Sequence, residues 1–165
     1  MTSTASEKRV AVITGAASGI GRALAVAYAS HGVRTVSGTY PGDPHDPAET
    51  LRQVERGGGS GVVHEVDVRD YAAAKAGVIG LTKSLALEVA EHNVLVNAIA
   101  PGPVETPMVA GITDAWKSAK RAELPLGRFG RPEEVAPTAV LLATDPGGNL
   151  YVGQTLGPNS GDVMP

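Results

Sequence analysis

The sequence predicts an α/β fold with a mostly parallel sheet, shortened to about five strands. Short apolar segments rich in β-branched residues alternate with segments whose apolar residues recur every three or four positions. A glycine-rich stretch joins the first of these strands directly to the first helix. The chain has 165 residues, which is enough to bury a core, so we predict a single domain over residues 1–165.

Strands are predicted where short apolar runs are bounded by glycine, proline or polar residues. They cover residues 9–15, 33–40, 61–68, 94–102 and 151–157. Helices are predicted from the spacing of apolar residues and from start and stop signals. They cover residues 20–31, 48–56, 71–92, 113–122 and 131–144. Pro137 lies inside the last helix and is expected to bend or delay it, and residues 103–108 are expected to form a loop.

The composition argues against several classes of protein. The net charge is only −3, which does not suggest nucleic-acid binding. The chain has no cysteine, and its four histidines are scattered, so we predict no disulfide and no metal site. No run of 18 apolar residues and no apolar signal region occurs, so a cytoplasmic protein without membrane association is expected.

The stretch TGAASGIG, residues 14–21, carries the first functional motif. Gly15, Gly19 and Gly21 permit a tight turn and let a pyrophosphate approach the backbone, next to the N–H groups at the start of a helix. An ordinary glycine-rich turn would have the same composition. The strand before the motif and the helix after it favour a dinucleotide site.

Tyr71 and Lys75 form the second motif, four residues apart on one face of a predicted helix. A tyrosine with a pKa near 10 is a poor proton donor or acceptor at neutral pH. A nearby ammonium group favours the tyrosinate and lowers this pKa, which suits general acid–base catalysis. A solvated surface pair would show the same spacing.

These two motifs and the stretch NAIAPGPVET, residues 97–106, resemble the short-chain dehydrogenase/reductase family. They are most similar to its classical subgroup, which includes 3-oxoacyl carrier-protein reductases. The resemblance implies a Rossmann-like, doubly wound sheet and an NAD(P)-dependent oxidoreductase that moves hydride between nicotinamide and a small carbonyl or alcohol substrate. It assigns the proton transfer to Tyr71, and Lys75 would also hold the nicotinamide ribose. Family members are commonly oligomers, so a homo-oligomer is possible.

The resemblance also assigns the cofactor site. Thr39 stands where an acidic residue would favour NAD, while Ser18 and Tyr40 stand where a basic residue would favour NADP. The cofactor is therefore NADP or NAD, with a slight preference for NADP. Asp67 and Val68 would contact the adenine. The Pro-Gly loop, residues 101–106, would contact the nicotinamide through the backbone of Val104 and the hydroxyl of Thr106. The full predicted set is Gly15, Ser18, Gly19, Ile20, Gly21, Thr39, Asp67, Val68, Lys75, Pro101, Gly102, Val104 and Thr106.

One part of the family pattern has no counterpart in this sequence. The family places two further αβ units, with a catalytic asparagine and a catalytic serine, between the third strand and the helix that carries Tyr71. Here only Arg69 and Asp70 lie between those elements, and Ser60 precedes its strand instead of following it. Removing two whole units would place residues 94–100 beside residues 10–14 in the sheet. The alternative function is therefore a shortened relative that binds a dinucleotide, or associates with other chains, without turnover.

Overall fold

The computed structural model describes residues 9–40, 42–65 and 71–163, with the backbone alone for residues 71–76. The chain divides into two compact units, Met1–Asp67 and Val68–Pro165, and each is described by itself. None of the helices in the described ranges is long and apolar enough to cross a lipid bilayer.

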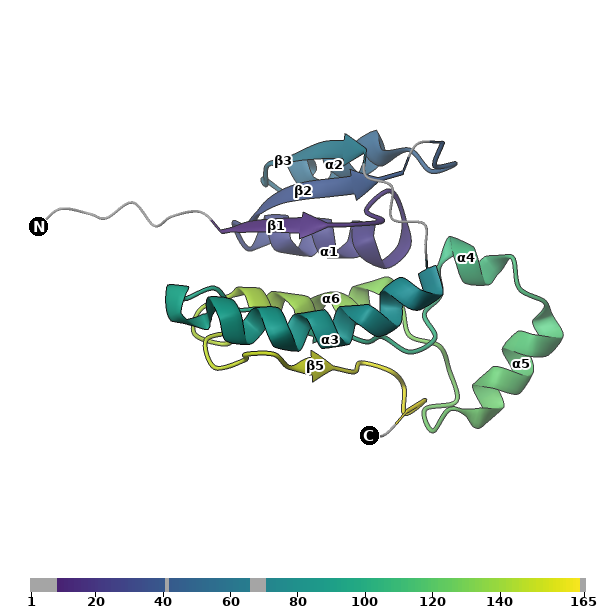
Figure 1. Cartoon of the computed structure of the whole chain (residues 1–165). Helices are drawn as coiled ribbons and strands as arrows, with labels where there is room; N and C mark the ends of the chain where they lie inside the picture. The colour runs from purple at the N-terminus through teal and green to yellow at the C-terminus, as the bar shows by residue number, and fades with distance from the viewer. Residues whose placement is uncertain (1–8, 41, 66–70, 164–165) are drawn as a thin grey trace, which may run out of the picture. The chain divides into compact units, whose positions relative to one another are not determined.

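The first unit contains a three-stranded parallel sheet in the order β1-β2-β3. In its register, Val12 of β1 lies beside Val36 of β2, which lies beside Val62 of β3. Two helices pack against this sheet (Figure 1). The elements are β1 (Val10–Ile13), α1 (Gly19–Ser30), β2 (Arg34–Thr39), α2 (Pro47–Arg56) and β3 (Gly61–Glu65).

Small side chains build the core of this first unit. Ala25 and Ala29 of α1 are buried, together with Ile13 from β1 and Val54 from α2. Since alanine has no side chain beyond Cβ, α1 can approach the sheet and α2 closely. Ala16 belongs to the same buried cluster, so the core also holds the glycine loop, residues 14–21, between β1 and α1.

The second unit is mainly helical, with a short parallel pair of strands in which Ala98 lies beside Thr155. Asn97 fixes this pair, because its amide donates to the Tyr151 carbonyl over 2.8 Å and accepts from the Gln154 N–H over 2.9 Å. The elements are α3 (Tyr71–Val89), η1 (Ala90–His92), β4 (Ala98–Ile99), α4 (Pro107–Ala110), α5 (Asp114–Glu123), α6 (Pro132–Ala143) and β5 (Thr155–Leu156).

The predicted α/β fold class with parallel strands is confirmed, and the described strands form two sheets of three and two strands. The pairing of residues 94–100 with residues 10–14 would join the two units and stays a prediction, as does the single domain. Pro137 does not delay α6, which runs unbroken from Pro132. Pro137 and Glu133 are both exposed, so the carbonyl that loses its helical partner faces water. The loop predicted at residues 103–108 already contains the start of α4.

Candidate functional site

The glycine loop requires glycine at its three motif positions for two different reasons. Gly15 has φ +65° and Gly19 has φ +52°, in the left-handed region that glycine adopts without strain. At Gly21 a Cβ atom would lie 2.8 Å from the Gly15 carbonyl carbon and closer still to its oxygen. Gly21 thus lets α1 begin directly against the backbone of the loop. A tight turn with close packing of the following helix is the local structure that the glycine pattern of dinucleotide-binding folds produces.

The loop lies at the carboxyl edge of the sheet, next to the end of β2. The N–H of Ala16 donates to the Gly38 carbonyl over 2.9 Å, which ties the loop to the residue before Thr39. Ser18 is the N-cap residue of α1 and has an extended backbone, but its side chain makes no capping hydrogen bond. Ile20 follows in the first turn of the helix and is half-buried. Ligands of open parallel sheets bind at this edge.

Asp43 is a site residue that the sequence analysis missed. The buried Thr39 hydroxyl donates to its carboxylate over 3.2 Å, and the backbone N–H of His45 donates to it over 2.9 Å. Burial opposes ionisation, but the hydrogen bonds from His45 and Thr39 together hold the pKa of Asp43 below its ordinary value. A carboxylate therefore stands beside the position where the sequence showed only a neutral hydroxyl. Its signal in the sequence is an acidic residue four positions after the strand end.

In the second unit, the loop after β4 is held from two sides. A Cβ atom on Gly102 would lie 2.6 Å from the Asn159 carbonyl oxygen, so the backbone at Pro101 and Gly102 passes close to Asn159. Further along, Gly130 donates to the Pro103 carbonyl and accepts from the Glu105 N–H, each over 2.9 Å. The conformation of this loop therefore depends on its contacts with Asn159 and Gly130, and no sequence motif indicated these two residues.

This pairing decides which peptide groups the loop presents. Because Pro103 and Glu105 bond to Gly130, the N–H and C=O of buried Val104 point to the opposite side, as alternate residues of an extended chain do. Thr106 is the N-cap of α4, and its hydroxyl makes no capping bond. The contacts of Val104 and Thr106 with a nicotinamide stay a prediction.

The remaining predicted residues lie close in sequence to the boundary between the two units, which falls after Asp67. Tyr71 opens α3 and Lys75 follows one helical turn later, so the backbone puts them on one face of the helix. Their side chains, and all of Asp67 and Val68, lie outside the described residues. The structure groups the glycine loop with Thr39 in the first unit, and Pro101, Gly102, Val104 and Thr106 in the second.

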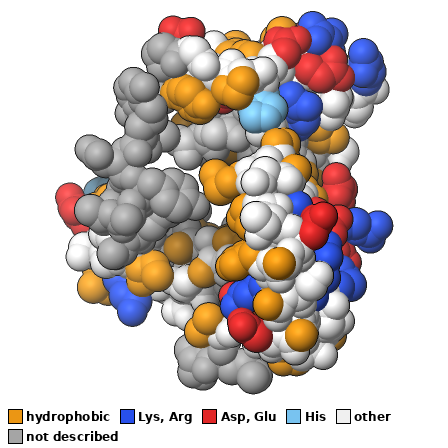
Figure 2. All heavy atoms as spheres, turned by 90° about the vertical axis from the view of Figure 1, so that its right-hand side faces the viewer, with side chains coloured by type: hydrophobic (Ala, Val, Ile, Leu, Met, Phe, Trp, Pro, Cys, Tyr) orange, Lys and Arg blue, Asp and Glu red, His pale blue; other side chains and the backbone are white. Residues whose placement is uncertain are grey.

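The side chains of the described residues show no other obvious reactive centre. In the described ranges, no three His, Cys, Asp or Glu residues are arranged to hold a metal ion. Figure 2 shows acidic and basic side chains interspersed on the face that it views. Several acidic and basic side chains of the described residues form ion pairs, as in the 2.6 Å contact between Lys120 and Asp162. The glycine loop of the first unit and the Pro-Gly loop of the second therefore remain the two candidate binding segments.

Comparison with known proteins connects these features to a family. The family model described as short chain dehydrogenase matches residues 9–71, and the one described as enoyl-(acyl carrier protein) reductase matches residues 69–161. The chain is 46% identical over 95 residues to a 3-oxoacyl-[acyl-carrier-protein] reductase of Thermotoga maritima, and 47% identical over 95 residues to that of Vibrio cholerae. Each match covers 58% of this chain and 38% of the relative, so the chain spans about two fifths of the length of the curated relatives it matches.

Solved structures show the same fold. A putative 2-deoxy-D-gluconate 3-dehydrogenase from Agrobacterium tumefaciens with bound NADP has a TM-score of 0.81 at 24% identity, covering 95% of this chain and 97% of that one. An actinorhodin polyketide ketoreductase with NADPH has a TM-score of 0.81 at 21% identity, covering 94% and 97%. The two family models together span both units, and the second alone matches more than half of the chain. The chain therefore belongs to the short-chain dehydrogenase/reductase family.

Proposed function

We propose that this chain is an NAD(P)-dependent oxidoreductase that acts on a carbonyl/alcohol pair. The observation that carries the proposal is the glycine loop, in which Gly15 and Gly19 have positive φ and Gly21 leaves no room for a Cβ atom. A glycine loop of this kind between a strand and a helix, at the carboxyl edge of a parallel sheet, is typical of dinucleotide sites. Membership of the family supports the same conclusion.

The residues of this chain have distinct roles in the proposed reaction. The glycine loop binds the pyrophosphate, and Thr39 with Asp43 lies where the adenosine ribose would be held. Val104 and Thr106 orient the nicotinamide ring, and Lys75 binds its ribose. The bound dinucleotide would supply or accept the hydride. The Tyr71 hydroxyl donates a proton to the substrate oxygen during reduction, and its tyrosinate form removes that proton during oxidation. The ammonium group of Lys75 favours the tyrosinate form that this transfer produces.

The dinucleotide is NADP or NAD. The solved relatives that contain NADP or NADPH support NADP, whereas the Asp43 carboxylate beside Thr39 supports NAD. The names of the 3-oxoacyl-[acyl-carrier-protein] reductases suggest a 3-oxoacyl thioester as the first substrate to test.

The test is turnover measured by the absorbance of the reduced nicotinamide, with 3-oxoacyl thioesters, ketones and alcohols as substrates. We expect Tyr71→Phe to lower turnover roughly a hundredfold or more, because the proton donor is lost. Tyr151→Phe is the matched control and should keep full activity, since the hydrogen bonds of Tyr151 to Asn97 and Gly148 are made by its backbone and survive the substitution. Equal activity of Tyr71→Phe and the unmodified chain would contradict the mechanism.

A second candidate is a relative that binds the dinucleotide without turnover. Its support is that the two family models meet at residues 69–71, where the resemblance implies two further αβ units with the catalytic asparagine and serine. Thermal shift on addition of NADPH or NADH separates the candidates. A raised melting temperature without turnover on any substrate favours the second candidate.

A homo-oligomer formed through α3 is part of the proposal. This helix carries exposed apolar side chains, a feature of surfaces that associate: Val78, Ile79, Leu81, Leu85 and Leu87 are 37–83% exposed. Light scattering coupled to size-exclusion chromatography should give a mass above 16.8 kDa, and Leu81→Lys should return it to that of one chain. A single-chain mass for the unmodified protein would contradict this part of the proposal.

A further inference from the structure

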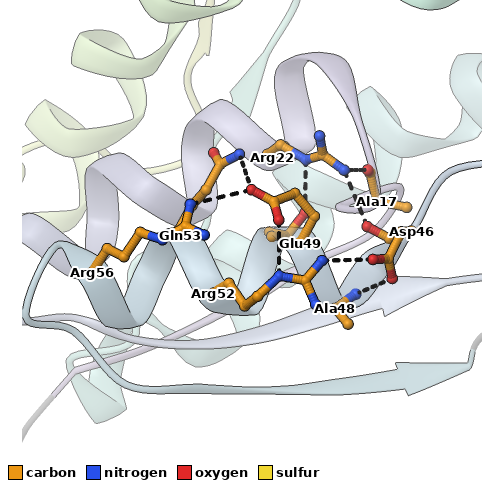
Figure 3. Close-up of polar contacts among 9 residues, drawn as sticks. Ala17, Arg22, Asp46, Ala48, Glu49, Arg52, Gln53 and Arg56 are labelled. Atoms are coloured by element: carbon orange, nitrogen blue, oxygen red, sulfur yellow. Dashed lines mark hydrogen bonds and ion pairs between the residues drawn. The ribbon is translucent and has the colours of Figure 1, made fainter.

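Thr50 connects α2 to the glycine loop. It is fully buried, and its hydroxyl donates to the Ala16 carbonyl over 2.7 Å. The same hydroxyl accepts a hydrogen bond from Nε of Arg22 over 2.9 Å. The Arg22 guanidinium also donates to the carbonyls of Ala17 and Asp46, and dashed lines mark both contacts in Figure 3.

The start of α2, from which these contacts come, is itself held in place. The Asp46 carboxylate caps the helix by accepting from the Ala48 N–H over 2.9 Å, and its other oxygen pairs with Arg52 over 2.7 Å. Glu49 also accepts from Arg52, over 2.8 Å (Figure 3). Thr50 therefore presents its hydroxyl to the loop from a rigid turn of helix.

Three successive carbonyls of the loop are bound in this way. Thr50 binds that of Ala16, the Arg22 side chain binds that of Ala17, and the Arg22 backbone N–H binds that of Ser18 over 3.1 Å. In a planar trans peptide the C=O and N–H bonds point in opposite directions. The N–H groups of Ala17, Ser18 and Gly19 are therefore turned away from the donors that hold the carbonyls.

An anion at a glycine loop needs this arrangement, with N–H groups directed at it and carbonyl oxygens directed away. If a loop carbonyl had no hydrogen-bond donor, its peptide group could rotate and present the carbonyl oxygen to the anion instead. We propose that Thr50, assisted by Arg22, is a positioning residue that sets the peptide orientation of the glycine loop for the pyrophosphate of the dinucleotide. This inference rests on the proposed function.

Thr50→Val tests the inference, because it removes the hydroxyl and keeps the shape of the side chain. Thr50→Ser keeps the hydroxyl and should restore binding. Thr35→Val is the matched control: Thr35 is 1% exposed in the same unit, and its hydroxyl has no hydrogen-bond partner in the part of the chain that the structure describes. Arg22→Lys keeps the positive charge near the loop but loses the planar group that bonds two carbonyls.

The affinities of the full chain for NADPH, NADH and inorganic pyrophosphate are measured by calorimetry. Hydrogen–deuterium exchange of residues 14–21 is measured without ligand. We expect Thr50→Val and Arg22→Lys to weaken all three ligands about tenfold and to speed exchange in the loop. Thr50→Ser and Thr35→Val should match the unmodified chain in both measurements.

Each outcome bears on the inference. Unchanged affinity in Thr50→Val, or an equal loss in Thr35→Val, would overturn the positioning role and leave the proposed function intact. If Thr50→Val does not fold, Arg22→Lys is the test instead, and an unchanged affinity of that variant for the three ligands would overturn the positioning role. An unmodified chain that binds neither dinucleotide nor pyrophosphate would overturn the proposed function and the positioning role together.

Discussion

Replacing Gly21 by alanine should weaken dinucleotide binding strongly. The added Cβ atom would lie 2.8 Å from the Gly15 carbonyl carbon and 2.9 Å from Cα of Ala16, whereas ordinary contact begins near 3.4 Å. The loop must therefore move by about half an ångström or more. Overpacking of this kind typically costs about 1–3 kcal/mol of folding stability.

The displacement affects binding because the moving atoms belong to the loop itself. A hydrogen bond weakens steeply when its length and angle leave the normal range, so a displaced loop loses part of its contact with the pyrophosphate. We expect the affinity for NADPH to fall at least tenfold, which corresponds to about 1.4 kcal/mol. The melting temperature should fall as well, and the stabilisation by added NADPH should shrink.

Gly80→Ala is the matched control. A Cβ atom at Gly80, inside α3, would meet nothing within 4 Å. Alanine is favoured over glycine inside a helix by about 1 kcal/mol, so this variant should melt at a higher temperature and bind NADPH normally. Thermal unfolding with and without NADPH, together with calorimetric titration, measures both effects. If Gly21→Ala binds NADPH with unchanged affinity, the glycine loop is not the pyrophosphate site.

Three further predictions follow from the described contacts. Asp43→Asn should raise the affinity for NADPH relative to NADH, because it removes a negative charge that would repel the 2′-phosphate; an unchanged ratio of the two dissociation constants at low salt would contradict this. The hydrogen bonds from Arg128 and then Arg131 lower the pKa of Glu134 from 4.5 to about 2, so its contribution to stability is complete above pH 4.5 and is lost as the pH falls towards 2. Glu134→Gln should therefore flatten the fall of the melting temperature between these two pH values, and a curve parallel to that of the unmodified chain would refute the assignment. Asn97→Ala removes two hydrogen bonds to the strand pair of the second unit, and urea unfolding should show a loss of about 1–3 kcal/mol.

The sequence predicted the elements that have a periodic pattern and missed those that depend on distant contacts. The helix predicted from Tyr71 begins at that residue. Within the second unit, and among the residues that the structure describes there, the strand predicted over residues 94–102 pairs at Ala98–Ile99 alone. Before Ala98, the Asn97 side chain and the Gly153 N–H make the contacts that a ladder would make. Helix α4 has only four residues, too few to show a period.

The same distinction applies to the candidate site. The three glycines could be identified because their spacing reflects local backbone geometry. The roles of Thr50 and Arg22 could not, because Thr50 bonds to a loop residue 34 positions earlier and to an arginine 28 positions earlier. Asp43 was missed because the expected acidic residue belongs at the strand end, and the loop after β2 brings this one back to Thr39. Residues that hold a motif in place are recognised only once the helices are packed.

Asp67 and Tyr71 cannot both act where the resemblance places them in one copy of the chain. In the family's strand order, the ends of the third and fifth strands are about four strand spacings apart, or roughly 19 Å. Four Cα–Cα steps from Asp67 to Tyr71 reach at most about 14 Å, whereas six steps from Glu65 reach about 22 Å. The Cα atom of Tyr71 can therefore stand at its family position only if that of Asp67 leaves the end of the third strand. A large loss of turnover in Tyr71→Phe would thus indicate that the Asp67 backbone lies away from its family position in the same copy of the chain.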